Sequence, residues 1–465
     1  MYKKIIDKIE NKNIAILGFG KEGQSTYSFI RRYFPDMMLT IIDKNEKLRD
    51  NCTLISSDKN ISFVLGPNYL EALEQYDLII KTAGISLKNI DTSKFISKLT
   101  SQFGLLLEDC DAFVIGVTGS KGKSTTSSLI YKVLKDQNKD VYLLGNIGVP
   151  PLDYIDKIFD ETILVIEMAA LQLEYIKKSP HIAILLNLFE EHLDFFGTTE
   201  RYYQAKLNIF KYQDKNDYSL YSKNNVTLKK YVEEGDFQSN LIEISYSKDE
   251  NSVASEAVYC DEDNIYIKKN KEVKKVYEVN QKRNLIGRHN LENIMFVLGV
   301  SDILNLDVDK TIDSINLFEG LEHRMEKVGT FDGVTFFNDV IATIPAATIN
   351  CIETLKEVDT LILGGMDRGI DYSGIIEYLS NSAIGNFICM PDSGVKIGKK
   401  IKEMSVKNVY FINTLEEAVI KAKEVTKKDG ICLLSPAAPS YNMYKNFEEK
   451  GRAYKQFVKG TSCQK

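Results

Sequence analysis

The sequence predicts an α/β protein of three domains. Twice a buried strand runs into a glycine-rich turn and then an amphipathic helix, and a third strand–helix rhythm starts near residue 319. The length of 465 residues agrees with three domains, because domains average about 150 residues. We place the boundaries where the rhythm restarts, which gives domains at 1–106, 107–318 and 319–465.

The composition is typical of a globular protein, with 44% hydrophobic residues, 27% charged residues and a net charge of -6. No apolar run reaches about 18 residues, and charges interrupt the first segment, so we expect neither a membrane span nor a signal peptide. The seven cysteines form no CxxC pair, which favours reduced thiols over disulfides or zinc and predicts a cytoplasmic protein. The mild acidity argues against nucleic-acid binding.

The first region alternates apolar strands, NIAILG, LTIID, ISFVLG and YDLIIK, with helical stretches, which predicts a parallel sheet. Gly18-Phe19-Gly20-Lys21-Glu22-Gly23 matches GxGxxG directly after the first strand, and Asp43 ends the second. In this fingerprint the glycines let the backbone approach a diphosphate, and the acid binds a ribose hydroxyl. The ligand is NAD or another nucleotide diphosphate; the alternative is a tight turn without a ligand.

The second region opens with the strand AFVIGVT and the segment Thr118–Thr125, TGSKGKST. In such a loop the backbone N–H groups cradle phosphates, Lys123 reaches the β and γ oxygens, and Ser124 can hold Mg²⁺. The usual pattern has a glycine five residues before Gly122, where this chain has Val117, so the segment is a variant P-loop. A glycine-rich turn with an exposed lysine is the alternative.

Further polar residues follow the strands DVYLLG, TILVIE and HIAILLNL. Glu167 closes one strand and His192 follows another, so both could hold a divalent cation beside the phosphates, although each alone is usually a solvated residue. Spacing alone makes Lys206 a surface lysine. Asn290 and Asn293 share a helix face, Asn290 being equally compatible with an N-cap. Residues 213–285 predict an antiparallel extension at the sheet edge.

The third region carries the strands GVTFFND, DTLILGG, NFICMPD, VKNVYFI and GICLLSP. They alternate with helical patterns, which again predicts a parallel sheet with helices on both faces. Arg324, in GLEHRMEKV, is either a phosphate-directed cation or an ordinary surface residue.

Together these segments resemble the Mur ligase family, most closely the branch that adds glutamate. The likeness covers essentially the whole chain, and its motifs occur in the family's order and spacing: TGSKGKST, GNIG, EMAALQLE, NLFEEHLDFF, YYQAKLNIF, GRHNLENI, GLEHRME, FFND, LILGGMDRGIDY and SPAAPSYNMYKNFEEKG. The resemblance implies a Rossmann-like N-terminal domain for a UDP-precursor, a central P-loop ATPase domain, and a Rossmann-like C-terminal domain for the amino acid.

The reaction that the resemblance implies is ATP-dependent addition of D-glutamate to UDP-N-acetylmuramoyl-L-alanine through an acyl phosphate, in peptidoglycan precursor synthesis. ATP and Mg²⁺ are the implied cofactors, and the implied partners are small-molecule substrates only. We expect a monomer. L-glutamate or another amino acid as acceptor stays an alternative.

The resemblance also assigns residues to roles. The catalytic positions are Lys123, Glu167, His192 and Lys206, of which Lys206 matches a carbamylated lysine, and the metal ligands are Ser124, Glu167, His192 and carbamylated Lys206. The ATP positions are Gly119, Ser120, Lys121, Gly122, Lys123, Ser124, Thr125, Asn290, Asn293, Arg324 and Asp339. The UDP-precursor positions are Gly18, Phe19, Gly20, Lys21, Asp43, Lys44 and Asn146. The amino-acid positions are Thr343, Arg368, Ser440, Tyr441 and Phe447.

Two departures from the family pattern fall in the third region. Ile341 stands where the family has a lysine, and Arg368 stands where it has another. Arginine keeps the charge and can grip a carboxylate with two hydrogen bonds, but its donor geometry differs. The identity or stereochemistry of the amino acid is therefore the open question at this stage.

Two functions outside this family also fit single motifs. The GxGxxG segment with Asp43 is compatible with a nicotinamide-dependent oxidoreductase, which leaves TGSKGKST without a role. A nucleotide-gated binding protein would use the P-loop as a switch, but it has less need of Glu167, His192 and Lys206.

Overall fold

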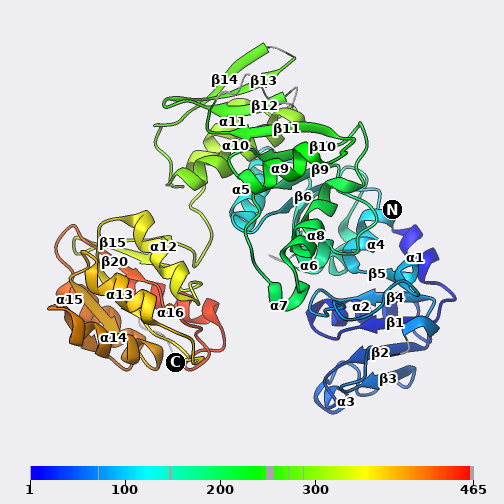
Figure 1. Cartoon of the computed structure of the whole chain (residues 1–465), viewed down its shortest axis with the longest axis horizontal. Helices are drawn as coiled ribbons and strands as arrows, with labels where there is room; N and C mark the ends of the chain where they lie inside the picture. The colour runs from blue at the N-terminus through cyan, green and yellow to red at the C-terminus, as the bar shows by residue number, and fades with distance from the viewer. Residues whose placement is uncertain are drawn as a thin grey trace. The chain divides into compact units, whose positions relative to one another are not determined.

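The computed structural model describes residues 2–71, 73–145, 149–247, 256–270, 272–285 and 287–460. Asn146, one of the predicted precursor-binding residues, lies outside these ranges. The chain divides into two compact units, 1–318 and 319–465. The α/β class predicted from the sequence is confirmed, since each sheet is wholly or mostly parallel and is flanked by helices (Figure 1).

The first sheet of unit 1 is parallel, with the strand order β3-β2-β1-β4-β5. Its strands are β1 Ile14–Leu17, β2 Leu39–Asp43, β3 Ile61–Leu65, β4 Leu78–Lys81 and β5 Leu99–Thr100. Its helices are α1 Lys3–Ile9, α2 Lys21–Tyr33, α3 Leu48–Asn51 and α4 Gln102–Asp109, with short 3-10 turns at Leu73–Gln75 and Ile96–Lys98. The chain reverses direction across the sheet between β1 and β4, so the ligand crevice of such a sheet is expected there.

The second sheet of unit 1 has the order β14-β13-β12-β11-β10-β9-β6-β8-β7. Its strands are β6 Phe113–Thr118, β7 Val141–Gly145, β8 Ile163–Glu167, β9 Ile182–Leu185, β10 Tyr218–Ser222, β11 Asn240–Ser245, β12 Glu256–Cys260, β13 Asn264–Lys269 and β14 Glu272–Glu278. The predicted antiparallel extension is therefore partly wrong. β10, β11 and β12 continue the parallel sheet, and only β13 and β14 pair antiparallel.

Helices join the strands of this second sheet, and each long one buries an apolar face. They are α5 Lys123–Asp136, α6 Ala170–Leu173, α7 Leu193–Phe196, α8 Thr199–Lys211, α9 Val226–Glu234, α10 Arg288–Ile303 and α11 Val308–Leu317, with 3-10 turns at Pro151–Asp153 and Ile155–Lys157. The side chain of Thr198 caps α8 by accepting a hydrogen bond from the N–H of Arg201. One hydrophobic cluster contains buried residues of both sheets, from Ile14 and Ile80 to Leu144 and Leu207, and makes unit 1 continuous.

The sheet of unit 2 has the order β15-β16-β20-β17-β18-β19, and only β15 runs antiparallel. Its strands are β15 Glu326–Phe331, β16 Val334–Asn338, β17 Val358–Leu363, β18 Asn386–Cys389, β19 Asn408–Phe411 and β20 Ile431–Leu434. Its helices are α12 Pro345–Leu355, α13 Ser373–Asn381, α14 Ser393–Met404, α15 Leu415–Val425 and α16 Phe447–Lys459.

Successive residues of β17 point to opposite faces, so Leu361 and Leu363 join one core cluster and Ile362 joins the other. Helices thus cover both faces of this sheet. No helix in the described ranges is both long and apolar enough to cross a bilayer.

Candidate functional site

The glycine-rich loop of the second sheet joins β6 to α5. Gly122 has φ +87° and precedes Lys123, the first residue of the helix. A Cβ at Gly122 would lie 2.9 Å from the Oδ1 atom of Asn293, so both backbone conformation and space favour glycine here. The start of α5 then presents N–H groups toward the loop, as an anion site requires.

The segment after β9 holds this loop in place. The Oδ1 atom of Asn187 accepts from the N–H of Lys121 at 2.8 Å, and its Nδ2 donates to the carbonyl oxygen of Lys121 at 3.1 Å. The hydroxyl of Ser120 lies 2.9 Å from the carbonyl oxygen of Phe189. Sequence reasoning did not identify Asn187, although its place at the end of a predicted strand was a usable signal.

Lys123 folds back over the loop that precedes it. Its Nζ donates to the carbonyl oxygens of Gly119 at 2.8 Å and Ser120 at 2.9 Å. The ammonium group therefore lies among the backbone atoms that would surround a phosphate. Ser124 and Thr125 follow in the first turn of α5 and are half-buried.

Lys206 is buried, so the surface lysine inferred from its spacing alone is wrong. It lies on α8 with 1% of its surface exposed, and its Nζ donates to the carbonyl oxygen of Gly119 at 2.7 Å. Burial lowers its pKa well below the usual 10.5, and the charge of Lys123 lowers it further. Burial thus favours the neutral amine, which is the form that can react with CO₂.

Glu167 and His192 occupy different environments. Glu167 ends β8 opposite Val117 of β6, has no exposed surface, and acts electrostatically on Lys206. His192 is exposed in a left-handed conformation with φ +57°, before α7. In the described part of the chain no three His, Cys, Asp or Glu side chains gather as a metal site, so any such site needs other donors.

Tyr202 connects these groups, and sequence reasoning assigned it no role. Its hydroxyl lies 3.0 Å from that of Ser120 and donates to Glu191 at 3.4 Å. Its ring centroid is 5.1 Å from the Nζ of Lys206 and 6.0 Å from the ring of His192. Burial raises the pKa of its hydroxyl. The signal was the four-residue spacing to Lys206, which places both on one face of α8.

Asn290 and Asn293 lie on α10 and both are buried. Gly287 is the N-cap of this helix, so Asn290 is not the cap residue. The amide nitrogen of Asn293 donates to the Oδ1 of Asn290 at 3.0 Å, and its own Oδ1 accepts from the hydroxyl of Thr126 at 3.1 Å. α10 is thus tied to the first turn of α5.

The GxGxxG turn lies at the carboxyl end of β1, as predicted. Gly18 has φ +91°, and a Cβ there would lie 2.2 Å from the Oγ1 of Thr82. The N–H of Phe19 donates to Asp43 at 2.8 Å, so Asp43 organises the turn itself. Gly20 caps α2, and Lys21 and Lys44 are exposed nearby along the chain.

In unit 2, Asp339 follows β16 and is 5% exposed. It accepts from the hydroxyl of Ser435 at 2.9 Å and from the N–H of Met325 at 3.2 Å. Burial raises its pKa to about 6, against the lowering effect of these hydrogen bonds. Arg324 is exposed and lowers that pKa through its charge.

The predicted amino-acid residues lie on several segments of unit 2. Ser440 is 2% exposed, and its hydroxyl has no hydrogen-bond partner among the described residues. Arg368 and Tyr441 are exposed, and Thr343 is half-buried before α12. Phe447 begins α16, where its ring meets that of His323 at a centroid distance of 6.2 Å. Ser440 is thus a buried hydroxyl with hydrogen-bonding capacity to spare.

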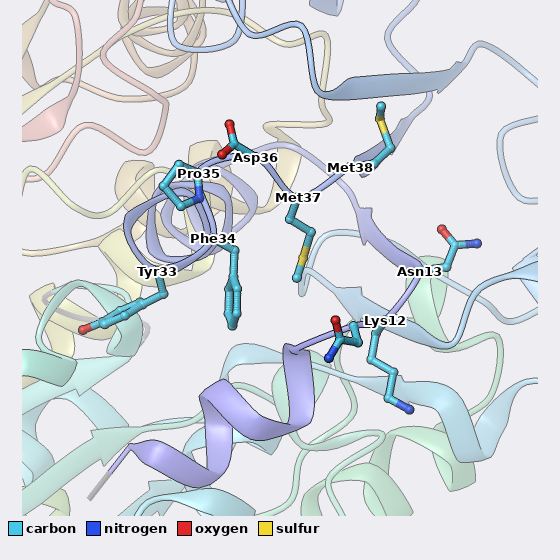
Figure 2. Close-up of a pocket in the computed structure, with 9 residues that line it drawn as sticks. Lys12, Asn13, Tyr33, Phe34, Pro35, Asp36, Met37 and Met38 are labelled. Carbon is cyan, nitrogen blue, oxygen red and sulfur yellow. The ribbon is translucent and has the colours of Figure 1, made fainter.

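An open cavity of about 560 Å³ lies at the other end of the first sheet (Figure 2). It is bordered by Asn13, directly before β1, by Met38, directly before β2, and by Tyr33, Phe34 and Met37. Because Asn13 precedes β1 and Gly18 follows it, the cavity and the glycine turn lie at opposite ends of the strands. The cavity is therefore separate from the candidate site.

Two family models match the chain: Mur ligase middle domain over residues 117–301, and Mur ligase, glutamate ligase domain over residues 323–438. Similar proteins include three named UDP-N-acetylmuramoylalanine--D-glutamate ligase. That of Clostridium tetani is 32% identical over 464 residues, 97% of each chain. That of Acetivibrio thermocellus is 30% identical over 466 residues, 97% of each chain. That of Clostridioides difficile is 29% identical, covering 97% of this chain and 99% of the relative.

Solved structures share the fold. The MurF ligase of Thermotoga maritima in complex with ADP has a TM-score of 0.56 at 18% identity, covering 98% of this chain and 97% of that one. The UDP-N-acetylmuramate-alanine ligase MurC of the same organism has a TM-score of 0.54 at 19% identity, covering 97% and 100%.

Proposed function

The chain belongs to the Mur ligase family, and on this premise we propose that it is an ATP-dependent ligase that adds D-glutamate to UDP-N-acetylmuramoyl-L-alanine. The product is a peptidoglycan precursor. The observation that carries this proposal is the arrangement of Lys123 and Lys206 on the carbonyl oxygen of Gly119, beside the carboxylate of Glu167. A dehydrogenase has no use for this arrangement.

The reaction joins a carboxylate to an amine. A carboxylate oxygen of the alanine attacks the γ phosphorus of ATP, the bond to the β–γ bridging oxygen breaks, and ADP leaves. The amino nitrogen of glutamate then attacks the acyl carbon, phosphate departs, and the nitrogen loses a proton. The residues of the site serve mainly to position these groups and to stabilise the negative charge of the transferring phosphoryl group.

The nucleotide loop supplies the first part of that stabilisation. Its backbone N–H groups and the start of α5 face the phosphates, and the Lys123 ammonium moves from the carbonyl oxygens of Gly119 and Ser120 to the phosphate oxygens. Asn187 and Ser120 keep the loop in its shape, so only the Lys123 side chain, and not the loop backbone, has to rearrange.

The residues around the loop also fit Mg²⁺. Ser124, Glu167, His192 and carbamylated Lys206 offer mostly oxygen donors, which this hard cation prefers. Glu167 is a wholly buried carboxylate that acts electrostatically on Lys206. Mg²⁺ bound there would neutralise phosphate charge. The low pKa of Lys206 supplies the neutral amine that forms the carbamate.

The three ligands are assigned to the three predicted domains. The precursor nucleotide lies at the Gly18–Gly20 turn, and ATP lies at the loop before α5, in contact with Asn290 and Asn293. Arg324 and Asp339, which belong to unit 2, stay predicted ATP positions. Glutamate lies at Thr343, Arg368, Ser440, Tyr441 and Phe447, where Arg368 grips a carboxylate.

The test is ADP release with purified full-length protein, ATP, Mg²⁺ and a panel of acceptors. We expect release only when both UDP-N-acetylmuramoyl-L-alanine and D-glutamate are present, with the ligated product seen by mass spectrometry. L-glutamate as the better acceptor would overturn the assignment of D-glutamate. Inactivity with every amino acid would overturn the ligase assignment.

A further inference from the structure

Lys81 is a buried lysine that none of the assigned roles uses. It is the last residue of β4 and is 4% exposed. β4 lies next to β1, and the chain changes direction across the sheet between these two strands. Ligands of parallel sheets bind at the carboxyl ends of the strands where this reversal occurs. Lys81 therefore stands at the predicted crevice of the first sheet.

The ammonium group of Lys81 has unused hydrogen-bonding capacity. Its Nζ donates to the carbonyl oxygen of Thr82 at 3.2 Å and lies 5.6 Å and 5.7 Å from the ring centroids of Tyr175 and Phe195. It forms no ion pair with any residue in the described ranges, although an ammonium has three donors. Burial lowers its pKa to about 8. A buried cation without an anion is costly unless a ligand provides one.

The acidic residues that face Lys81 each contact another group, although the second carboxylate oxygen of Glu174 is buried without a hydrogen-bond partner in the described ranges. Glu174 and Glu22 raise the pKa of Lys81 through their charge, and Arg201 lowers it. Glu174 forms an ion pair with Arg201 at 2.6 Å. Glu22 accepts from the N–H of Ala83 at 2.9 Å. These groups surround Lys81 without neutralising it directly.

The strand end that carries Lys81 is bonded to the glycine turn. The N–H of Thr82 donates to the carbonyl oxygen of Leu17 at 2.9 Å, directly before Gly18. The turn itself has its Phe19 N–H occupied by Asp43. An anion held at this turn therefore meets an acidic residue on one side, and Lys81 is the buried cation on the strand next to it.

We propose that Lys81 binds an oxyanion of the nucleotide precursor and thereby sets the affinity for that substrate. The inference rests on the proposed function, because that function supplies the precursor. The precursor carries two such groups, a diphosphate and a terminal carboxylate, which offer a lysine the same chemistry. In this proposal Lys81 acts on the binding of the precursor and not on the chemical steps.

The test is calorimetric titration of the full chain, without ATP, with UDP, with UDP-N-acetylmuramoyl-L-alanine and with its alaninamide form, whose carboxylate is blocked. Lys81→Met should weaken binding of the precursor by about tenfold or more, as loss of a charged hydrogen bond does. Lys81→Arg should recover part of this loss. The KM for ATP should stay within about twofold, because the ATP loop is a separate site.

The three ligands distinguish the two oxyanions. If Lys81 binds the diphosphate, Lys81→Met weakens all three; if it binds the carboxylate, only the unblocked precursor is affected. The matched control is Lys88→Met, an exposed lysine that donates to the carbonyl oxygen of Asp194 and should leave affinity unchanged. An unchanged precursor Kd in Lys81→Met, with or without a lower Tm, would overturn the proposal. A wild-type protein that binds no precursor would instead contradict the proposed function.

If Lys81→Met does not fold, the wild-type protein still provides a test. Precursor affinity should fall as the pH rises through about 8, where Lys81 loses its charge. The tyrosine beside it does not titrate in this range, since burial raises the pKa of Tyr175 to about 12. Affinity that stays constant between about pH 7 and pH 9 would overturn the proposal.

Discussion

Lys206 and Lys123 donate hydrogen bonds to the same atom, the carbonyl oxygen of Gly119, at 2.7 Å and 2.8 Å. Two lysines of the same charge approach each other this closely at little cost only if one of them is neutral. Burial and the neighbouring charge both favour the neutral form of Lys206. The site thus contains Lys123, a charged lysine suited to bind phosphate, and Lys206, a neutral lysine suited to become a carbamate.

Replacement of Lys206 tests the second role. Lys206→Ala should reduce turnover by about 100-fold or more, because the carboxylate of the carbamate would hold a metal ion that stabilises the transferring phosphoryl group by several kcal/mol. Added acetate or formate should restore part of the rate by occupying the vacated space. Lys211→Ala, an exposed lysine at the end of the same helix, is the control. Turnover near the wild-type rate in Lys206→Ala would contradict the carbamate.

Replacement of Lys123 tests the first role. Lys123→Ala should lower kcat by about 100-fold to 1,000-fold, because the loop then lacks its charge on the transferring phosphoryl group. Lys121→Ala should have a small effect, since that side chain is exposed and its backbone makes the contacts to Asn187. Steady-state ADP release measures both. Equal losses in the two variants would show that general loop charge, rather than the position of Lys123, matters.

Two glycines of the first turn differ in what they tolerate. Gly18→Ala should lower the free energy of unfolding by about 2–4 kcal/mol. The reasons are that Gly18 has a positive φ, which alanine adopts at a cost, and that the new Cβ would lie 2.2 Å from the Oγ1 of Thr82. Gly20→Ala should cost less than about 1 kcal/mol, because nothing lies within 4 Å of its Cβ and its φ is -72°. Urea unfolding of the full chain compares them. Similar losses would mean that the turn is set by something other than the Gly18 conformation.

Asp339 should make the stability of unit 2 depend on pH. Its pKa is raised from 3.8 to about 6, so the folded state keeps a proton that the unfolded state has lost, and stability falls as pH rises from about 4 to 6. Asp339→Asn should remove this loss of stability. Near pH 7 it should raise the free energy of unfolding by up to about 3 kcal/mol, minus the cost of the altered hydrogen bonds. Unfolding curves at several pH values measure it. Asp332→Asn, at an exposed position, is the control, and parallel wild-type and Asp339→Asn profiles would contradict the prediction.

The fold was accessible from sequence wherever strands were apolar and bounded by turns. The strands before Gly18 and Thr118 and those of the third region lie where predicted. β5 and β15 were missed, because β5 has two residues and β15 carries Glu326 and Lys327 on a half-exposed edge. The direction of β10 to β12 was mistaken, since charge-rich edge strands show the same alternation in parallel and antiparallel sheets.

The site was less accessible, because contacts rather than motifs define part of it. The loop residues Gly122 and Lys123 follow from their local pattern. The burial of Lys206 and the use of Asp43 by the Phe19 N–H depend on segments far apart in the chain. The burial of Lys81 also could not be predicted from the sequence, because a lysine that follows three apolar residues can equally well be a solvated residue at the end of a strand.

The core clusters described above each lie within one unit, and the clusters of unit 2 contain no residue before 319. Mutations that reshape the predicted acceptor residues therefore do not disturb the packing that positions Lys123 and Lys206. Replacement of Ile341 or Arg368 should therefore leave the unfolding of unit 1 unchanged.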